Sequence, residues 1–509
     1  MSMRLYPLGQ QDFREIIREG KVYVDKTKFA LQLITSQKYY FLSRPRRFGK
    51  SLFLSSLYYL FQGEKELFKG LYVYDKWHFE PYPIIKISFS NIGYREMGLN
   101  KAIDLQLQEI GKAYDIILSA ESNSTKFKEL IDKLQSKYDK NVVVLIDEYD
   151  KPLIDYLDKD NLYQALENRD ILKSFYSVIK DADAHLKLVF ITGVSKFSQV
   201  SIFSDLNNLN DISLTIAYNE LCGISQKELE ENFSDELEMY DGEKIKTWYN
   251  GYKWDVNGAT VYNPFSLLSF FVKSGDYQNF WYTTGTPTFL MKMCRQQHLY
   301  KFEEVSINQD ELGNFDIENL KIIPILFQTG YLTIKSENPI LRNYKLTFPN
   351  QEVRESYLRN LADQYIGSNS YSSSNILETL LESLKNKDAD LLKMSLNMAF
   401  AQIPNDLWQR ESEQYYHAIV HLLFSLLNVY IFSEVHTQQG RADAIIIYEG
   451  QIYCMEFKLD QSARAALEQI LERGYTDRFK ESGQPIHHIG INFSSEQKKV
   501  EEIIWDRSI

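Results

Sequence analysis

Residues 41–53, FLSRPRRFGKSLF, decide how the first part of this chain is interpreted. The stretch closes with Gly49, Lys50 and Ser51, which match the end of the phosphate-loop pattern G-x-x-x-x-G-K-[ST]. The first glycine of that pattern would stand at residue 44, where this chain has Arg44. Pro45 follows it and is expected to fix the turn, because its ring restricts the backbone. The stretch therefore predicts a phosphate-binding loop with an unusual beginning.

The segments around this loop have the periodicity that a phosphate loop requires. The apolar run 39–43 predicts a strand, and residues 50–62 carry Leu54, Leu57 and Phe61 at helical spacing. A loop between a strand and a helix is the expected setting. Further apolar runs, separated by helical segments, predict strands at 84–89, 142–146 and 188–192. This α/β alternation indicates a parallel sheet with helices on both faces.

The end of the loop carries the groups that would bind a nucleotide. Backbone N–H groups near Gly49 and at the start of the following helix would point at phosphate oxygens. Lys50 would reach the β- and γ-phosphates, and Ser51 would bind Mg²⁺. Additional positive charge beside the phosphates is expected from Arg44, Arg46 and Arg47.

A second acidic segment, VVVLIDEYD at 142–150, supports the nucleotide site. Asp147 would hold the Mg²⁺, and Glu148 would polarise the attacking water, because ligands bind at the carboxyl ends of parallel strands. A solvated acidic turn is the alternative for this segment alone. Thr192, at the end of the next strand, could sense the γ-phosphate, as could Ser195 or Lys196. A plain turn at that strand end is the alternative.

The last third of the chain predicts the order α-β-β-β-α-β. The pattern indicates a helix over about 411–428 and, after three strands, a second helix over about 462–473. The strands are expected at 429–437, 441–449, 451–459 and, after the second helix, 487–493.

Two of these strands carry residues suited to metal chemistry. Strand periodicity places Glu456 and Lys458 on one face and Phe457 on the other, and the turn at Gly450 brings Asp443 beside Glu456. The two carboxylates and the Phe457 carbonyl would form an oxygen site for Mg²⁺. Lys458 would orient a water or stabilise phosphate charge. The alternative is an exposed hairpin face with a Glu–Lys cross-strand pair.

The middle of the chain is mixed in character. It begins with an acidic helical stretch, and the runs 326–335 and 343–350 predict a hairpin in a winged-helix-like lid module. The serine-rich stretch 367–375 predicts a linker or loop tip. We therefore expect an ATPase-like domain at 1–225, the lid module at 226–366 and a C-terminal domain at 375–509.

Composition limits the function further. The 509 residues carry a net charge of −12, which argues against a surface that grips nucleic acid throughout. Three cysteines far apart predict neither a disulfide framework nor a zinc site. The longest apolar run, 417–432, falls short of the ~20 residues that a membrane span needs. The N-terminus does not resemble a signal peptide. A cytoplasmic location and no membrane partner are expected.

Several motifs resemble those of bacterial AAA-ATPase-like proteins with a C-terminal PD-(D/E)XK nuclease-superfamily domain. They are YVDKT (23–27), SRPRRFGKSL (43–52), LIDEYD (145–150), ITGVSKFSQVSIFSDLNNL (191–209), YNPFSLL (262–268) and TGYLTIK (329–335). The resemblance covers nearly the whole chain and implies that the arginine-rich loop is a family trait. It also implies a D…ExK site at Asp443, Glu456 and Lys458. Further residues that match are Glu413, as an additional metal ligand, and Gln469 and Tyr475, near the phosphate or Lys458.

The resemblance implies an ATP-hydrolysing protein, using ATP and Mg²⁺, coupled to a nuclease domain that acts on DNA, with foreign or mobile DNA as the expected target. A homo-oligomer is compatible with such an ATPase. Two alternatives stay open. One is an ATP-dependent switch or scaffold whose nuclease-like domain only binds a partner or nucleic acid. The other is a signalling ATPase whose middle hairpin module docks a protein or DNA.

Overall fold

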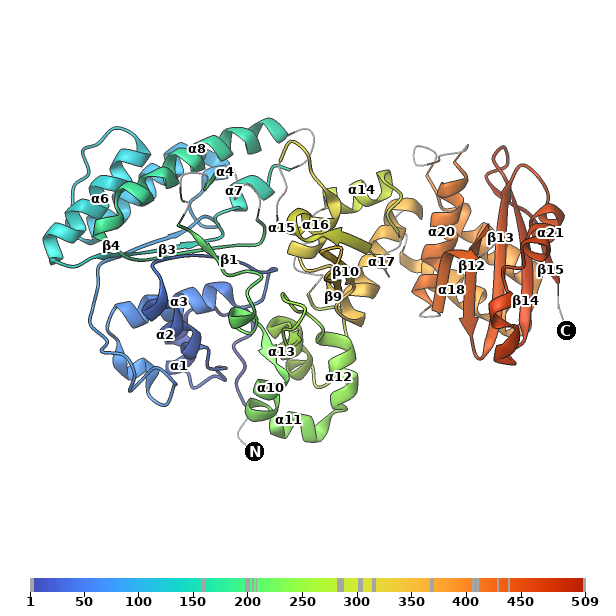
Figure 1. The fold of residues 1–509 in the computed structure, drawn as a ribbon, viewed down its shortest axis with the longest axis horizontal. Helices are drawn as coiled ribbons and strands as arrows, with labels where there is room; N and C mark the ends of the chain where they lie inside the picture. Colours follow the sequence, from blue (N-terminus) through green and yellow to red (C-terminus); the bar gives the residue numbers. More distant parts are fainter. Residues whose placement is uncertain are drawn as a thin grey trace. The chain divides into compact units, whose positions relative to one another are not determined.

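The computed structural model contains two compact units (Figure 1). One unit comprises Met1–Gly285 and Glu303–Val353, and the other comprises Thr286–Phe302 and Arg354–Ile509. The structure describes the whole chain except residues 1–3, 158–160, 197–201, 204–205, 207, 282–287, 301–304, 314–316, 367–369, 405–407, 409–411, 428–429, 438–439 and 507–509. The three-part division expected from the sequence stays a prediction.

The first unit is built on a five-stranded sheet of order β2-β3-β4-β1-β5, in which every neighbouring pair is parallel. Its strands are β1 (Tyr39–Ser43), β2 (Ile84–Ser88), β3 (Val142–Asp147), β4 (Leu186–Gly193) and β5 (Asn210–Asp211). Every residue of β1 and β3 is buried, as expected for strands covered on both faces. Ser43 lies opposite Gly193, and Ile146 lies opposite Ile191, so the carboxyl ends of β1, β3 and β4 share one edge.

Helices cover both faces of this sheet, which confirms the predicted architecture. Figure 1 shows α1–α3 on one side and α6 and α8 on the other. The helices are α1 (Phe13–Arg18), α2 (Thr27–Ser36), α3 (Lys50–Phe61), α4 (Tyr94–Met97), α5 (Leu99–Ala113), α6 (Asn123–Tyr138), α7 (Lys151–Ile154) and α8 (Leu162–Asp181), with short 3-10 turns η1 (Lys65–Phe68), η2 (Asp183–His185) and η3 (Ile216–Tyr218).

The rest of the first unit is a helical layer and a small antiparallel sheet. The helical layer holds β6 (Ile224–Ser225), α10 (Gln226–Asn232), α11 (Ser234–Met239), α12 (Gly242–Tyr249), β7 (Val261–Tyr262) and α13 (Pro264–Val272). The sheet has the order β8-β10-β9 and consists of β8 (Val305–Asn308), β9 (Thr333–Asn338) and β10 (Asn343–Thr347). Helices α15 (Gln309–Gly313) and α16 (Ile322–Gln328) lie between β8 and β9 in the chain. The predicted hairpin is confirmed in β9 and β10. However, residues 326–328 end helix α16, because Gly330 turns the chain with φ +92°.

The second unit carries a mixed sheet of order β11-β12-β13-β14-β15, with helix α21 packed against β13 and β14. Its elements are α14 (Thr288–Gln296), α17 (Gln351–Ile366, which begins in the first unit), α18 (Ser370–Asn386), α19 (Ala389–Phe400), α20 (Glu413–Leu426), β11 (Tyr430–Thr437), β12 (Gly440–Tyr448), β13 (Gln451–Leu459), α21 (Ala463–Arg473), η6 (Asp477–Ser482), β14 (Ile486–Ser494) and β15 (Lys499–Asp506). The expected α-β-β-β-α-β order is confirmed, and only β13 and β14 pair in parallel.

Two features of this unit differ from the sequence prediction. The expected linker at 367–375 is wrong for residues 370–375, which lie in α18, while 367–369 fall outside the described residues. Serine favours helix starts, and Ile376, Leu380 and Leu384 are buried at helical spacing after it. Strand β15 was not predicted, because the adjacent Glu501 and Glu502 interrupt the alternation of a strand.

No helix in the described parts of the chain combines the length and the apolar character needed to cross a membrane.

Candidate functional sites at the sheet edges

The phosphate loop runs from the end of β1 to the first turn of α3. The Lys50 ammonium is buried and donates hydrogen bonds to the main-chain oxygens of Arg44 and Pro45, both at 2.9 Å. Arg47 and Gly49 make the turn with left-handed backbones, at φ 68° and 90°. Burial lowers the pKa of Lys50, while the nearby carboxylates of Glu148 and Asp147 oppose that change. The loop therefore encloses the Lys50 ammonium with its own main-chain oxygens.

Arg44 explains how this loop manages without its first glycine. Residue 44 does not have a left-handed backbone, so its geometry does not require glycine. Its guanidinium turns into the core, donates to the carbonyl oxygens of Ser43, Ser213 and Tyr218 at 2.9, 2.6 and 3.1 Å, and lies 4.5 Å from the Trp254 ring centroid. The expectation that Arg44 places charge beside the phosphates is therefore wrong, because these carbonyls hold the charge in the interior.

A cavity of about 450 Å³ opens beside the loop. Arg46, Arg47, Gly49, Lys50 and Ser51 line it from the loop, and Glu148, Asp150 and Lys151 line it from the end of β3. The rest of the lining is more apolar and comes from residues 7–11, Leu52, Ser90, Asn91, Ile154, Val194, Pro264, Phe265 and Leu268. The Arg47 guanidinium lies 5.0 Å from the centroid of the Phe265 ring. The cavity lining thus combines charged and apolar side chains, which suits a nucleoside phosphate.

Asp147 and Thr192 meet at the ends of the neighbouring strands β3 and β4. The Thr192 hydroxyl donates to the Asp147 carboxylate at 2.5 Å, and both side chains are buried. Neither is among the described residues that line the cavity, whereas Glu148, with a left-handed backbone at φ 52°, does line it. The structure therefore places Thr192 where it orients Asp147, and Glu148 where it can face a ligand.

Asp150 is a structural partner that the sequence interpretation missed. Its buried carboxylate accepts from the N–H groups of Val194 and Ser195 and from the Ser195 hydroxyl at 2.6 Å. Burial raises the pKa of Asp150, and the Ser195 hydrogen bonds oppose this. Lys196 pairs with Asp211 at 2.6 Å. Ser195 and Lys196 are therefore held by carboxylates, and Asp150 ties the segment after β4 to the end of β3.

Trp281, Gly330 and Glu352 form a second set of contacts that supports the loop. The Trp281 indole donates to the main-chain oxygen of Arg46 at 3.3 Å, and its backbone N–H donates to the Glu352 carboxylate at 2.7 Å. Gly330 packs so closely on Pro45 that an added Cβ would lie 2.8 Å from the proline ring. Gly330 of the TGYLTIK motif and Trp281 therefore contact the loop at Pro45 and Arg46.

In the second unit, the hairpin of β12 and β13 brings the expected carboxylates together. The Phe457 N–H donates to Asp443 Oδ2 at 2.8 Å, and the Asp443 N–H donates to Glu456 Oε2 at 3.3 Å. Gln469 on α21 bridges the next residues: it accepts from the Lys458 ammonium at 2.6 Å and donates to Glu456. Tyr475 lies 3.1 Å from the same amide.

The electrostatics of this group favour a bound cation. Burial raises the pKa of Glu456 to about 8, and the neighbouring Asp443 contributes in the same direction. Burial also raises the pKa of Asp443, while His417 opposes that change. Without a cation, two adjacent carboxylates in a buried setting disfavour full ionisation. The adjoining cavity of about 710 Å³ is lined by Glu413, Asp443, Glu456, Lys458, Gln461, Ala465, Glu468, Gln469, Glu472, Arg473 and Tyr475.

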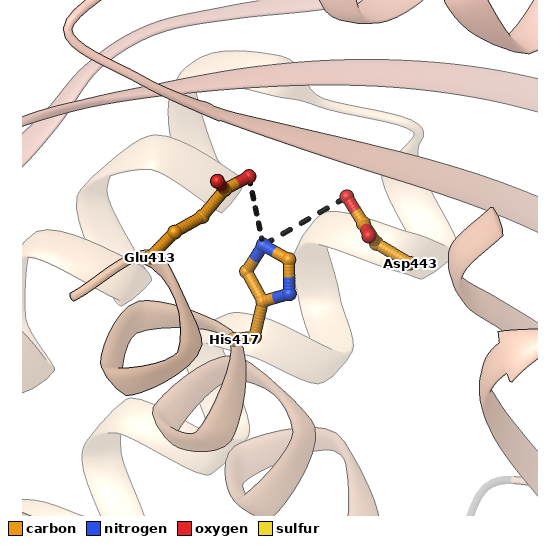
Figure 2. Close-up of side chains that lie close together, drawn as sticks. All are labelled: Glu413, His417 and Asp443. Atoms are coloured by element: carbon orange, nitrogen blue, oxygen red, sulfur yellow. Dashed lines mark ion pairs between the residues drawn. The ribbon is translucent and has the colours of Figure 1, made fainter. Parts of the chain in front are cut away.

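His417 also belongs to this site, although the sequence interpretation did not include it. Figure 2 shows its ring between Glu413, one turn earlier on α20, and Asp443 on β12. Its Nε2 atom lies 3.6 Å from Glu413 Oε1 and 3.8 Å from Asp443 Oδ2. Potential ligand atoms of the three residues all lie within 4.8 Å of one another. The i, i+4 spacing of Glu413 and His417 was visible in the sequence, but their approach to β12 was not.

Comparisons with known proteins match the two regions of the chain that contain these sites. A family model described as predicted AAA-ATPase matches residues 7–203, and a model of the PD-(D/E)XK nuclease superfamily matches residues 411–503. The chain is 39% identical over 517 residues to a protein of Azotobacter chroococcum mcd 1 described as an uncharacterized protein in the vnfD 5′ region, and the match covers 98% of each chain. No solved structure matches the chain.

Replacing Arg44 with glycine should destabilise the first unit even though it restores the usual loop pattern. The change removes a buried cation from three carbonyl oxygens, and losses from buried networks of this kind amount to about 3 kcal/mol. Urea denaturation of both proteins measures the difference. Arg46→Gly is the matched control, since Arg46 lines the cavity, and it should weaken nucleotide binding with little loss of stability. Equal stability of Arg44→Gly and wild type would contradict the assignment.

Glu352→Gln should flatten the pH dependence of stability in the first unit. Burial raises the pKa of Glu352 to about 7, so the folded protein keeps a proton that the unfolded chain releases near 4.5. The unfolding free energy of the wild type should fall as the pH rises from about 4.5 to about 7 and then level off, by at most about 3 kcal/mol. Tryptophan fluorescence during urea unfolding at several pH values reports this change.

The control is Glu231→Gln, which alters an exposed carboxylate on α10. It should leave the pH profile of the wild type intact. If the Glu352→Gln protein keeps the wild-type slope between about pH 5 and pH 7, the buried carboxyl is not its source.

Proposed function

This chain belongs to the same family as the Azotobacter protein and carries a predicted AAA-ATPase domain and a PD-(D/E)XK nuclease-superfamily domain, and on this basis we propose that it couples ATP hydrolysis to metal-dependent cleavage of DNA. The observation that carries the first activity is the cavity between Lys50 and Glu148. The observation that carries the second is the convergence of Asp443, Glu456 and Lys458 beside one cavity.

The residues around the first cavity fit ATP and Mg²⁺. Lys50 would exchange its two carbonyl partners for phosphate oxygens, and Arg46 and Arg47 would add charge at the same end. Ser51 and Asp147 would hold Mg²⁺, whose role is to neutralise phosphate charge. The apolar wall formed by residues 7–11 and by Pro264, Phe265 and Leu268 would contact the base.

Glu148 is proposed to act on the attacking water. It lines the cavity directly after the end of β3, and its left-handed backbone turns the chain away from the direction of that strand. A carboxylate in this place would orient the water and accept its proton as the water oxygen bonds to the γ-phosphorus and the bond from that phosphorus to the departing ADP oxygen breaks. Thr192 would keep Asp147 in place for the metal by its hydrogen bond.

The C-terminal residues divide their proposed roles between metal binding and charge stabilisation. Asp443 and Glu456 would provide ligand oxygens, and the metal would supply Lewis acidity at the scissile phosphate. Gln469 holds the Lys458 ammonium near Glu456, 3.7 Å from its carboxylate. Lys458 would stabilise the charge that develops on the phosphate. The seven acidic and basic side chains that line this cavity are mostly acidic, so we propose that DNA reaches it as a metal-bridged strand and that binding of bare duplex is weak.

We propose foreign or mobile DNA as the target and an oligomer as the working form of the ATPase, both on the family resemblance. An ATP-dependent switch with a nuclease-like domain that only binds is the alternative outcome of the tests below.

Two variants separate nucleotide binding from hydrolysis. Lys50→Ala should weaken ATP binding and abolish turnover, because the ammonium is the main cation at the phosphate end of the cavity. Glu148→Gln should bind ATP like wild type and lose turnover by about 100-fold, since the amide cannot accept the proton of the water. A fluorescent ATP analogue measures binding, and phosphate release measures turnover.

Glu121→Gln alters an exposed carboxylate of the same unit and should behave like wild type in both assays. Wild-type turnover in the Glu148→Gln protein would show that Glu148 does not handle the water.

Plasmid nicking in the presence of Mg²⁺ or Mn²⁺ tests the second activity. Lys458→Ala should lower the nicking rate by about 100-fold while metal binding persists, because the lysine is assigned to charge stabilisation. Lys480→Ala, which changes an exposed lysine of the same unit, is the control and should nick like wild type. If wild type itself leaves plasmid intact with either ion, the binding-only alternative replaces cleavage.

A further inference from the structure

We propose that Glu413, His417 and Asp443 form a mixed nitrogen–oxygen site that selects a first-row transition-metal ion over Mg²⁺. The inference rests on the proposed nuclease function and names the class of ion that this site uses. The sequence alone predicted an oxygen-only Mg²⁺ site at Asp443, Glu456 and the Phe457 carbonyl. Among the described residues, a group of three side chains whose possible ligand atoms all lie within 4.8 Å of one another instead includes an imidazole.

The separations of the donor atoms fit one ion. Metal–nitrogen and metal–oxygen bonds of about 2.0–2.2 Å allow two donors of one ion to lie at most about 4.4 Å apart. His417 Nε2 satisfies this limit with Glu413 Oε1 at 3.6 Å and with Asp443 Oδ2 at 3.8 Å. All three donors lie within 4.8 Å of one another, so a small side-chain adjustment completes the set.

The two elements that carry these donors fix their positions. Glu413 and His417 are four positions apart on α20, one helical turn, and therefore lie on one face of the helix. The His417 ring packs edge-on against Phe457, with ring centroids 4.8 Å apart, and Phe457 in turn donates its N–H to Asp443. The imidazole is thus positioned by the strand that neighbours the carboxylate it faces.

His417 also has an unmet polar atom that a metal would satisfy. Within the described part of the chain, its Nε2 is buried and has no partner at hydrogen-bonding distance. A buried polar atom left in this state is unfavourable, because it has lost its hydrogen bonds to water without replacing them. The two nearest oxygens belong to carboxylates and lie too far away for a hydrogen bond but at suitable separations for shared coordination. This atom is the observation that distinguishes the site from a cluster of acidic groups.

The Glu456 carboxylate contacts a different set of residues. Its carboxylate accepts from the Gln469 amide and from the Asp443 N–H, and the Lys458 ammonium lies 3.7 Å away. Asp443 therefore faces both groups, with His417 and Glu413 on one side and Glu456 on the other. The three-residue donor set at Asp443 whose atoms lie within 4.8 Å of one another therefore includes nitrogen.

An imidazole in the donor set changes which ion is preferred. Mg²⁺ is a hard ion that takes oxygen ligands and retains water, so a nitrogen ligand contributes little to its binding. First-row transition ions accept imidazole together with carboxylates, and Mn²⁺ has the lowest affinity of that series. Mn²⁺ is therefore the most demanding probe. A site that prefers Mn²⁺ over Mg²⁺ should also prefer the other first-row transition ions, because they bind such sites more tightly than Mn²⁺.

Electron paramagnetic resonance of Mn²⁺ tests the proposal on the full chain without nucleotide. Free Mn²⁺ gives a signal that bound Mn²⁺ loses, and competition with Mg²⁺ gives the affinity for the second ion. His417→Gln should weaken Mn²⁺ binding about tenfold or more and change Mg²⁺ binding by about twofold or less, because the amide provides no comparable nitrogen ligand. Asp443→Asn should weaken the binding of both ions and so locates the signal at this site.

His185→Gln is the matched control. His185 also faces a carboxylate, Asp132 at 2.8 Å, but lies in the other unit. It should leave both affinities at the wild-type values, and near-ultraviolet circular dichroism without metal checks that each variant is folded.

An unchanged ratio of Mn²⁺ to Mg²⁺ affinity in folded His417→Gln would overturn the inference. That result is separate from the proposed function: a protein that nicks plasmid with an unchanged ratio loses only this inference. A protein that binds Mn²⁺ through His417 but never nicks plasmid loses only the nuclease activity.

Discussion

The Lys50 ammonium, held by the carbonyl oxygens of Arg44 and Pro45, is the interaction around which the first unit is arranged. Those oxygens can reach the lysine because the Arg44 side chain leaves the loop and anchors in the core. Trp281 and Gly330 then hold the loop from outside, at Arg46 and Pro45. Asp147, Glu148 and Asp150 follow from the parallel register, which places the end of β3 beside this loop.

In both candidate sites, hydrogen bonds hold a lysine ammonium in place. Lys50 is held by two carbonyl oxygens, and Lys458 is held by Gln469. The hydrogen-bond partners are neutral in both cases, but Lys458 also forms an ion pair with the Glu456 carboxylate at 3.7 Å. A phosphate can therefore replace the two partners of Lys50 without first breaking an ion pair, whereas at Lys458 it would share the ammonium with Glu456. This shared arrangement is consistent with phosphate chemistry in both units.

The sequence predicted those parts that depend on local periodicity. The parallel strands, the hairpin of β12 and β13 and the approach of Asp443 to Glu456 all follow from strand patterns and one turn. It could not predict the destination of the Arg44 side chain, because its partners lie about 170 residues away in the chain. The hydrogen bonds of Asp150 and the approach of His417 to β12 could not be predicted for the same reason, since they also join residues that are far apart in the chain. Strand β15 was missed because charged neighbours conceal its pairing.

Helix α17 begins at Gln351, and its second residue, Glu352, accepts a hydrogen bond from the backbone N–H of Trp281. Trp281 thereby joins two parts of the first unit, because its indole donates to the main-chain oxygen of Arg46 in the phosphate loop while its backbone N–H donates to Glu352. A ligand that moves the loop backbone at Arg46 would therefore also disturb the first turn of this helix.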